Sequence, residues 1–264
     1  MTEQIFDIPW DRFQALTPVD KAPYLMQENG APYHTLFAQQ FGAETLDALA
    51  RLANQIRAIA KTRAGTEFLK TQVSHKRAML YFSQPSSRTF LSFMSACQIL
   101  GVQTGEVRDT AISSEFKGES REDSVRTFSS YFDLIVMRTP EKGLAEHMAW
   151  VLSNSERSIP IINAGSGQDQ HPTQALLDVY TLLRSFERGG GLRDKTVVFC
   201  GDLLRGRTVR SLSYLLTNYP NIRQIFVAPP QLQVGEDVLA ALKQKNAAFE
   251  VTSDFHAVLP EAEE

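Results

Sequence analysis

The stretch Ala78-Met79-Leu80-Tyr81-Phe82-Ser83-Gln84-Pro85-Ser86-Ser87-Arg88-Thr89 decides the fold, because a strand-like apolar run passes directly into a polar helix start. The same change recurs along the chain. Further strands are expected at 134–137, 159–162, 196–200, 225–228 and 249–252, and helices at 43–61, 87–100, 120–132, 143–154, 172–186, 207–218 and 236–245. Alternating strands and helices indicate βαβ units and right-handed crossovers. We therefore predict an α/β fold with mainly parallel sheets flanked by helices.

Three consecutive glycines, Gly189-Gly190-Gly191, mark the best domain boundary, because such a run cannot hold a helix. We expect a first α/β domain over 41–187 and a second over 192–264. Prolines interrupt residues 1–40, which are expected to form an irregular arm that packs on the surface or on a partner. The second domain shows only three strands, which is few for an independent sheet, and it is expected to be incomplete.

Composition and charge exclude several classes of protein. The 264 residues are 43% hydrophobic and 22% charged, as in an average globular protein, and the net charge of -3 argues against a nucleic-acid partner. The chain shows neither a signal-peptide pattern nor an apolar run that could span a bilayer. Cys97 and Cys200 lack CxxC spacing and are expected to be buried thiols in a reducing cytoplasm. The histidines lack ligand spacing, so we expect no metal and no other cofactor.

The first candidate site is the helix start at Ser86, Ser87, Arg88 and Thr89. A helix start exposes unpaired N–H groups and a partial positive charge, which favours anions. The three hydroxyls add donors, and Arg88 adds a guanidinium fork suited to phosphate oxygens. Capping of the helix explains Ser86 or Ser87 equally well. It does not explain an arginine in the first turn, where a cation opposes the helix dipole and needs an anionic partner.

Two further polar clusters follow strand-like runs. Arg138 comes directly after the run at 134–137, although a surface ion pair explains it as well. His171 and Gln174 share one face of the helix expected at 172–186; a histidine there polarises a carbonyl or simply caps the helix. Because ligands sit at the carboxyl ends of the strands in an open parallel sheet, the three clusters predict a pocket for a small phosphorylated substrate.

Five stretches of the chain occur in the order found in one known family. They are Ser86–Thr89, Lys117–Ser120, Val136–Arg138, His171–Asp178 and Gly201–Val209. Together they resemble the transcarbamoylases, the aspartate/ornithine carbamoyltransferase family, from about residue 43 onward. The last two stretches resemble the aspartate branch of the family more than the ornithine branch.

The resemblance implies a role for each residue of the three clusters. The residues implied to hold the phosphate of carbamoyl phosphate are Ser86, Ser87, Arg88, Thr89 and Arg138. Arg88, Thr89 and His171 would be catalytic, because they would contact the carbonyl oxygen, on which negative charge develops when an amine attacks. Gln174 would contact the amino group of carbamoyl phosphate. We assign no protein base, because the substrate's own phosphate can accept the proton.

The resemblance also implies a shared active site. Ser113 and Lys117 would be donated by the neighbouring subunit, which makes the active unit a homotrimer, alone or in a larger assembly. Lys117 and Arg207 would bind aspartate. Without the family, Ser113 and Lys117 belong to a polar surface loop, and Arg207 is equally well explained as an ion-pair partner of Asp202.

The chain departs from the family in two places. Phe90 follows Thr89 where the family loop commonly continues with a second arginine, which removes one expected charge. The chain also stops before the further aspartate-binding segments and the terminal helix of the family.

The function implied is that of a transferase, which moves the carbamoyl group of carbamoyl phosphate to the amino group of L-aspartate, an early step of pyrimidine biosynthesis. The alternatives are an ornithine or other amino-acid carbamoyltransferase, and a non-catalytic transcarbamoylase-like assembly subunit. Arg207 favours an acidic acceptor.

Overall fold

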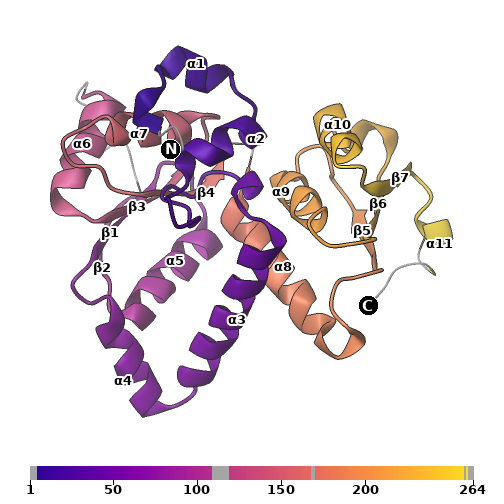
Figure 1. The fold of residues 1–264 in the computed structure, drawn as a ribbon, viewed down its shortest axis with the longest axis horizontal. Helices are drawn as coiled ribbons and strands as arrows, with labels where there is room; N and C mark the ends of the chain where they lie inside the picture. The colour runs from indigo at the N-terminus through magenta and orange to yellow at the C-terminus, as the bar shows by residue number, and fades with distance from the viewer. Residues whose placement is uncertain (1–4, 109–118, 168–169, 259, 261–264) are drawn as a thin grey trace. The chain divides into compact units, whose positions relative to one another are not determined.

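The computed structural model describes residues 5–108, 119–167, 170–258 and 260 (Figure 1). The chain divides into two compact units. The first comprises Met1–Gln40 and Arg51–Gly167, and the second comprises Phe41–Ala50 and Gln168–Glu264. This division assigns helix α8 (Pro172–Ser185) to the second unit, whereas the glycine run predicts it in the first. The helix packs against α9 (Arg207–Leu216) of the second unit, which accounts for the difference.

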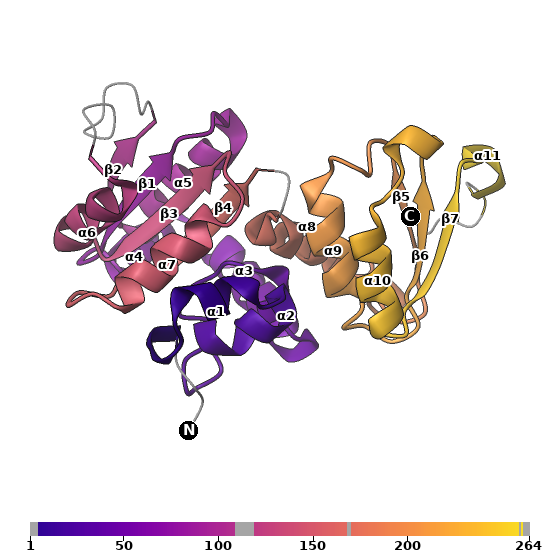
Figure 2. The same ribbon diagram turned by 90° about the horizontal axis from the view of Figure 1, so that it is seen from above.

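The first unit is built on a four-stranded parallel sheet in the order β2-β1-β3-β4 (Figure 2). Its strands are β1 (Arg77–Phe82), β2 (Gln103–Val107), β3 (Leu134–Thr139) and β4 (Ile161–Ser166). Its helices are α1 (Trp10–Ala15), α2 (Pro18–Lys21), α4 (Arg63–Gln72), α5 (Ser87–Leu100), α6 (Arg121–Tyr131) and α7 (Leu144–Ser153), with the second half of α3 (Ala43–Ile59), from Arg51 onward. It also contains the 3-10 turns η1 (Ile5–Asp7), η2 (Ala22–Leu25) and η3 (Ala38–Gln40). The predicted parallel α/β fold is confirmed.

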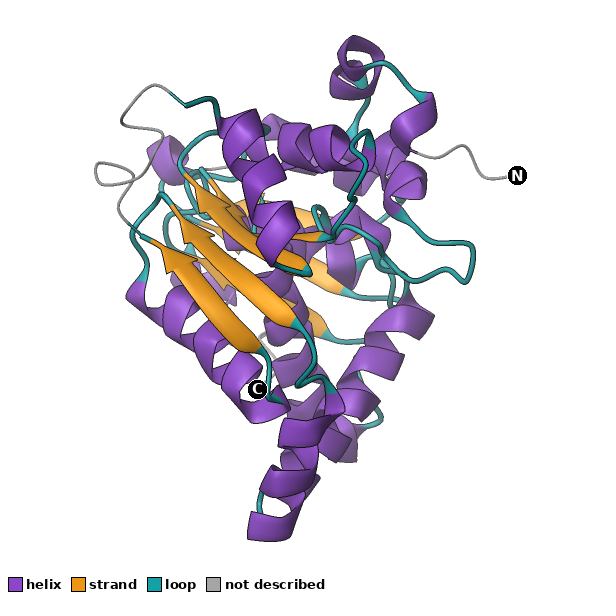
Figure 3. Ribbon diagram, turned by 90° about the vertical axis from the view of Figure 1, so that its left-hand side faces the viewer, coloured by secondary structure: helices purple, strands orange, loops and turns teal. Residues whose placement is uncertain are grey.

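Helices cover both faces of this sheet (Figure 3). Side chains alternate along β1, as the pleat requires. Met79 and Tyr81 join the core formed with α6, α7 and the N-terminal segment, whereas Leu80 and Phe82 pack with Phe90 of α5. A strand buried on both faces reads as a continuous apolar run, which is why β1 is legible in the sequence.

Strand β2 and helix α4 are two elements that the sequence pattern did not predict. The β2 sequence, Gln103-Thr104-Gly105-Glu106-Val107, has no apolar run; β2 is an edge strand and is only partly buried. Helix α4 follows α3 closely and begins after the Thr62 cap, whose hydroxyl accepts from the Gly65 amide at 3.0 Å. Both elements lack the hydrophobic periodicity of a buried strand or helix, so the sequence pattern does not reveal them.

The N-terminal segment is not the irregular arm that its prolines predict. Its short helices and the bend between the first two place Ile8, Phe13 and Leu25 in the core that also contains α7 residues. The prolines start helices as well as interrupting them: Pro18 occupies the first position of α2, directly after the Thr17 cap. The segment is thus part of the first unit's core rather than a surface arm.

A buried histidine ties the N-terminal segment to β4. His34 is fully buried; its Nδ1 accepts from the Ile161 amide at 3.0 Å, and its Nε2 lies 2.9 Å from Ser153 Oγ. Since an amide can only donate, Nδ1 is the acceptor, and the neutral ring carries its hydrogen on Nε2. Burial lowers the pKa of His34 from its ordinary 6.5 to about 3, because the charged ring loses its hydration.

The stability of the protein is therefore expected to fall in mild acid. Between pH 6.5 and 3 the unfolded chain binds a proton at His34 that the folded chain does not, so this contribution is complete above pH 6.5 and is lost as the pH falls. The loss in the free energy of unfolding is about 2 kcal/mol between pH 7 and pH 5, measured by urea titration. In His34→Asn, whose amide oxygen can still accept from Ile161, the loss should disappear. The exposed control His75→Asn should retain it, and equal pH dependence in all three proteins would contradict the assignment.

The second unit is built on a three-stranded parallel sheet in the order β5-β6-β7. Its strands are β5 (Thr196–Cys200), β6 (Arg223–Val227) and β7 (Ala248–Thr252). Its further helices, after α8 and α9, are the 3-10 turns η6 (Glu187–Gly189) and η7 (Pro230–Leu232), α10 (Glu236–Gln244) and α11 (Phe255–Val258). Its core contains Phe199, Leu216 and Phe226.

One thiol differs from its predicted state. Cys97 is buried as expected, but Cys200 is exposed, because it is the last residue of β5, an edge strand. None of the helices in the described ranges has the length and the hydropathy that a membrane span requires.

Candidate active site

The start of α5 presents a row of donors. The helix begins after Ser86, whose carbonyl accepts from the Phe90 amide at 3.1 Å, but the Ser86 side chain makes no capping hydrogen bond. The amides of residues 87–89, and the hydroxyls of Ser86, Ser87 and Thr89, make no hydrogen bond with any other residue that the structure describes. The capping explanation of Ser86 is therefore wrong. This helix start retains the set of donors that an anion requires.

Arg88 differs from Arg63, an arginine in a comparable position. Arg63 also lies in the first turn of a helix, and its Nε is 3.0 Å from the Glu67 carboxylate. Arg88 is exposed and makes no ion pair or hydrogen bond within the described part of the chain. A cation in the first turn is unfavourable unless an anion balances it. Arg63 has that anion in its own helix, whereas Arg88 is available for one from outside.

Arg138 supports the α5 loop from the neighbouring strand. It is buried, and its Nη1 donates to the Ala164 carbonyl at 2.9 Å. Its own carbonyl accepts from Ser83 Oγ and from the Gln84 amide, both at 3.3 Å, which ties the segment between β1 and α5 to β3. The register of β3 and β4 shifts beside Arg138, where Gly165 adopts φ 117°, a conformation that favours glycine. Arg138 thus lies inside the sheet edge and is not a surface ion-pair residue.

His171 caps helix α8, and the cap defines its tautomer. The residue is 7% exposed, and its Nδ1 accepts from the Gln174 amide at 3.3 Å. A backbone amide can only donate, so in the neutral ring the hydrogen is on Nε2. The capping and functional explanations are therefore compatible, because the cap holds the imidazole in the form that donates from Nε2.

Gln174 is held by Asp178, which was not among the predicted site residues. Gln174 Nε2 donates to Asp178 Oδ1 at 2.9 Å, one turn along α8. Since Asp178 takes the amide nitrogen, Gln174 Oε1 is directed as an acceptor, which suits an –NH2 group. Burial raises the pKa of Asp178, and its hydrogen bond with Gln174 partly opposes the rise. The spacing of four residues on one helix face was the signal for this pair.

The remaining predicted residues fall into two groups. Arg207 is the first residue of α9, and burial lowers its pKa. Asp202 has an ion pair with Arg205, with Nη1 to Oδ2 at 3.4 Å. Ser113 and Lys117 lie outside the described residues. Of the other predicted residues, the α5 set and Arg138 belong to the first unit, and His171, Gln174 and Arg207 belong to the second.

A match to a protein-family model shows which known proteins this chain is related to. The model for the carbamoyl-phosphate-binding domain of the aspartate/ornithine carbamoyltransferases matches residues 33–184. The chain belongs to this family. The matched segment of this carbamoyltransferase chain contains the start of α5, Arg138, His171 and Gln174. The family resemblance that the motifs indicated is therefore confirmed.

Individual carbamoyltransferases support the aspartate branch. The chain is 41% identical over 225 residues to aspartate carbamoyltransferase 1, chloroplastic, of Pisum sativum, over 84% of this chain and 54% of the relative. The catalytic subunit of M. jannaschii aspartate transcarbamoylase matches with a TM-score of 0.76 and 34% identity, over 88% of this chain and 72% of that chain. The Trypanosoma cruzi enzyme in complex with carbamoyl phosphate and aspartate matches with a TM-score of 0.75 and 34% identity, over 87% and 74%. The chain spans about half the length of the Pisum sativum relatives, 54% to 56%.

Proposed function

We propose that this carbamoyltransferase chain joins the carbamoyl group of carbamoyl phosphate to the amino group of L-aspartate, giving N-carbamoyl-L-aspartate and phosphate, an early step of pyrimidine biosynthesis. The observation that carries the proposal is the start of α5, where amides, hydroxyls and the Arg88 guanidinium are all available to an anion. Its relatives support the choice of acceptor, because they are aspartate carbamoyltransferases.

The proposed mechanism assigns each described residue an electrostatic role. Ser86, Ser87, Arg88 and Thr89, with Arg138, hold the phosphate. The amine of aspartate attacks the carbonyl carbon, the bond from that carbon to the phosphate oxygen breaks, and the amine proton passes to the departing phosphate. Nε2–H of His171, with Arg88 and Thr89, stabilises the negative charge on the carbonyl oxygen. Gln174 Oε1 accepts from the carbamoyl –NH2, and Arg207 binds an aspartate carboxylate.

Ser113 and Lys117 complete the proposal. We propose that they are donated by a neighbouring subunit of a homotrimer, with Lys117 also binding aspartate. We also retain the reducing cytoplasm as the proposed compartment; the Pisum sativum relatives are chloroplastic enzymes by name.

The test is carbamoyl-aspartate formation by this 264-residue chain at saturating carbamoyl phosphate and L-aspartate, with L-ornithine as the alternative acceptor. We expect turnover with aspartate at least 10²-fold above that with ornithine, because a site built for a carboxylate leaves buried charges unpaired with the wrong acceptor. Equal turnover with ornithine would contradict the aspartate assignment. Absence of turnover with both, together with binding of carbamoyl phosphate, would support the non-catalytic alternative.

Asp178 gives a separate prediction, because it acts only through Gln174. Asp178→Ala removes a hydrogen bond to a charged acceptor, and we expect KM for carbamoyl phosphate to rise about tenfold with kcat changed less than threefold. Asp178→Asn retains an acceptor oxygen and should restore most of the affinity. A merely structural role would lower stability and kcat together and would not be rescued by asparagine, so steady-state kinetics of both variants, with thermal unfolding, distinguish the two.

A further inference from the structure

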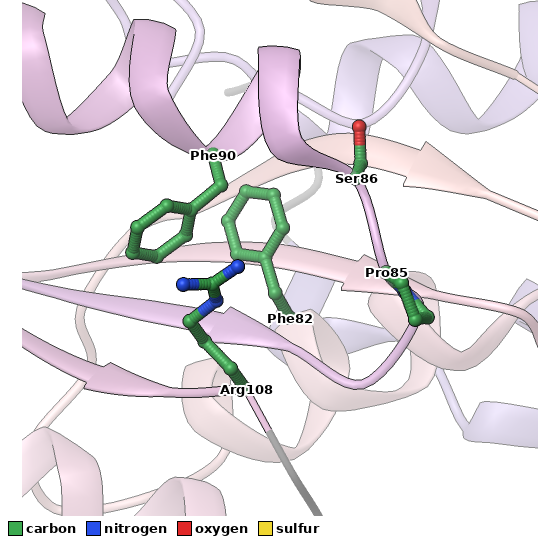
Figure 4. A pocket seen from close by; sticks show the side chains of 5 residues that line it. All are labelled: Phe82, Pro85, Ser86, Phe90 and Arg108. Carbon is green, nitrogen blue, oxygen red and sulfur yellow. The ribbon is translucent and has the colours of Figure 1, made fainter.

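A small pocket lies beside the start of α5 within the first unit. Its volume is about 280 Å³, and its lining residues are Phe82, Pro85, Ser86, Phe90 and Arg108 (Figure 4). The hydroxyl-bearing Ser86 and the cationic Arg108 therefore border the same space. The other three residues are apolar, and Arg108 is exposed, so an anion can reach its guanidinium from solvent.

The strand register brings Arg108 to this pocket. In the parallel pairing of β1 and β2, Val107 is opposite Tyr81, so the next residue, Arg108, is level with Phe82. Arg108 thus leaves β2 at the carboxyl edge of the sheet, the same edge from which the chain passes into α5. Ligands of open parallel sheets bind at this edge. Arg108 was not predicted from the sequence, because β2 carries no apolar run.

The Arg108 side chain is held by an aromatic ring. The centre of its guanidinium is 4.3 Å from the centroid of the Phe90 ring, and Figure 4 shows the group reaching toward Phe90 and Phe82. Phe90 is 4% exposed and meets Phe82 edge to face at 5.3 Å, so the platform is rigid. An aromatic ring attracts a guanidinium through its face, which leaves the N–H groups at the rim able to donate. Arg108 makes no ion pair or hydrogen bond to another residue in the described ranges.

We propose that Arg108 is a phosphate-binding residue of this active site. It supplies, from the end of β2, a second positive charge in place of the arginine that Phe90 replaces in α5. The inference rests on the proposed function, since the phosphate is that of carbamoyl phosphate. Phe90 then contributes by orienting the Arg108 guanidinium toward the anion, although it carries no charge itself. The planar fork of Arg108 matches two phosphate oxygens, which an ammonium group cannot do.

The test is isothermal titration calorimetry of the full chain with inorganic phosphate and, separately, with freshly dissolved carbamoyl phosphate. For Arg108→Gln we expect affinity for both anions to fall about tenfold, because one charge-assisted hydrogen-bonded contact is lost. Arg108→Lys should recover only part of the loss. The matched control is Arg63→Gln, an exposed arginine paired with Glu67, which should bind as the unaltered chain does.

The outcomes separate this inference from the proposed function. If the unaltered chain binds both anions, Arg88→Ala weakens binding and Arg108→Gln binds within twofold of the unaltered chain, the role of Arg108 is overturned and the proposed function stands. If the unaltered chain binds neither anion, both are overturned. As a further check, the double variant Phe90→Arg with Arg108→Gln moves the charge to α5. Recovery of affinity in this variant would support the exchange of charge between the two positions.

Discussion

Replacing Arg88 with alanine should lower kcat/KM for carbamoyl phosphate by about 10³-fold or more, the largest single effect we expect in this protein. The proposed site uses Arg88 on both the phosphate and the carbonyl oxygen, so the substitution removes charge-assisted hydrogen bonds from the leaving group and from the oxyanion together. The protein itself should fold normally. Arg88 is exposed and has no ion-pair partner within the described residues, so thermal unfolding should change little.

Arg63→Ala is the matched control for Arg88→Ala. Both arginines lie in the first turn of a helix, but Arg63 is paired with Glu67 and belongs to no proposed site. Its activity should stay within twofold of the unaltered chain. More than a tenth of the original activity in Arg88→Ala, measured as carbamoyl-aspartate formation, would remove Arg88 from the catalytic set.

The second large effect is expected at His171, where two substitutions separate the cap from the chemistry. His171→Asn can still accept from the Gln174 amide but has no donor in the place of Nε2, so kcat should fall about 10²-fold with stability nearly unchanged. His171→Gln extends toward the position of Nε2 but cannot cap in the same way. It should retain more activity and lose about 1 kcal/mol in the free energy of unfolding.

This pair of variants gives a clear outcome for His171. If His171 only caps α8, the asparagine variant should be active and the glutamine variant should be impaired through its stability. If its Nε2–H stabilises the carbonyl oxygen, the order of activity is reversed. Steady-state kinetics and urea unfolding, made on the same preparations, distinguish the two roles.

Much of the fold was predictable because most of its strands are rich in apolar and β-branched residues, at the edges of the sheets as well as at their centres. Strand β5 and helix α5 have the predicted bounds, and β1 and β7 begin only one residue before theirs. Strand β2 was missed because it is only partly buried and its sequence carries no apolar run. The N-terminal segment was misread because proline is both a helix breaker and a helix starter, and only the core beneath α7 shows which role applies.

The candidate site divides in the same way. Local sequence determined the family, the parallel α/β fold and the residue types at the starts of α5 and α8, because motifs at strand ends depend on neighbours along the chain. Only the tertiary structure decided how those residues are used. It leaves Ser86 without a capping bond, places the hydrogen of His171 on Nε2, directs Gln174 through Asp178, and brings Arg108 from β2 onto Phe90. Strand register and burial join residues far apart in sequence, and no local pattern encodes which donors remain available when the chain has folded.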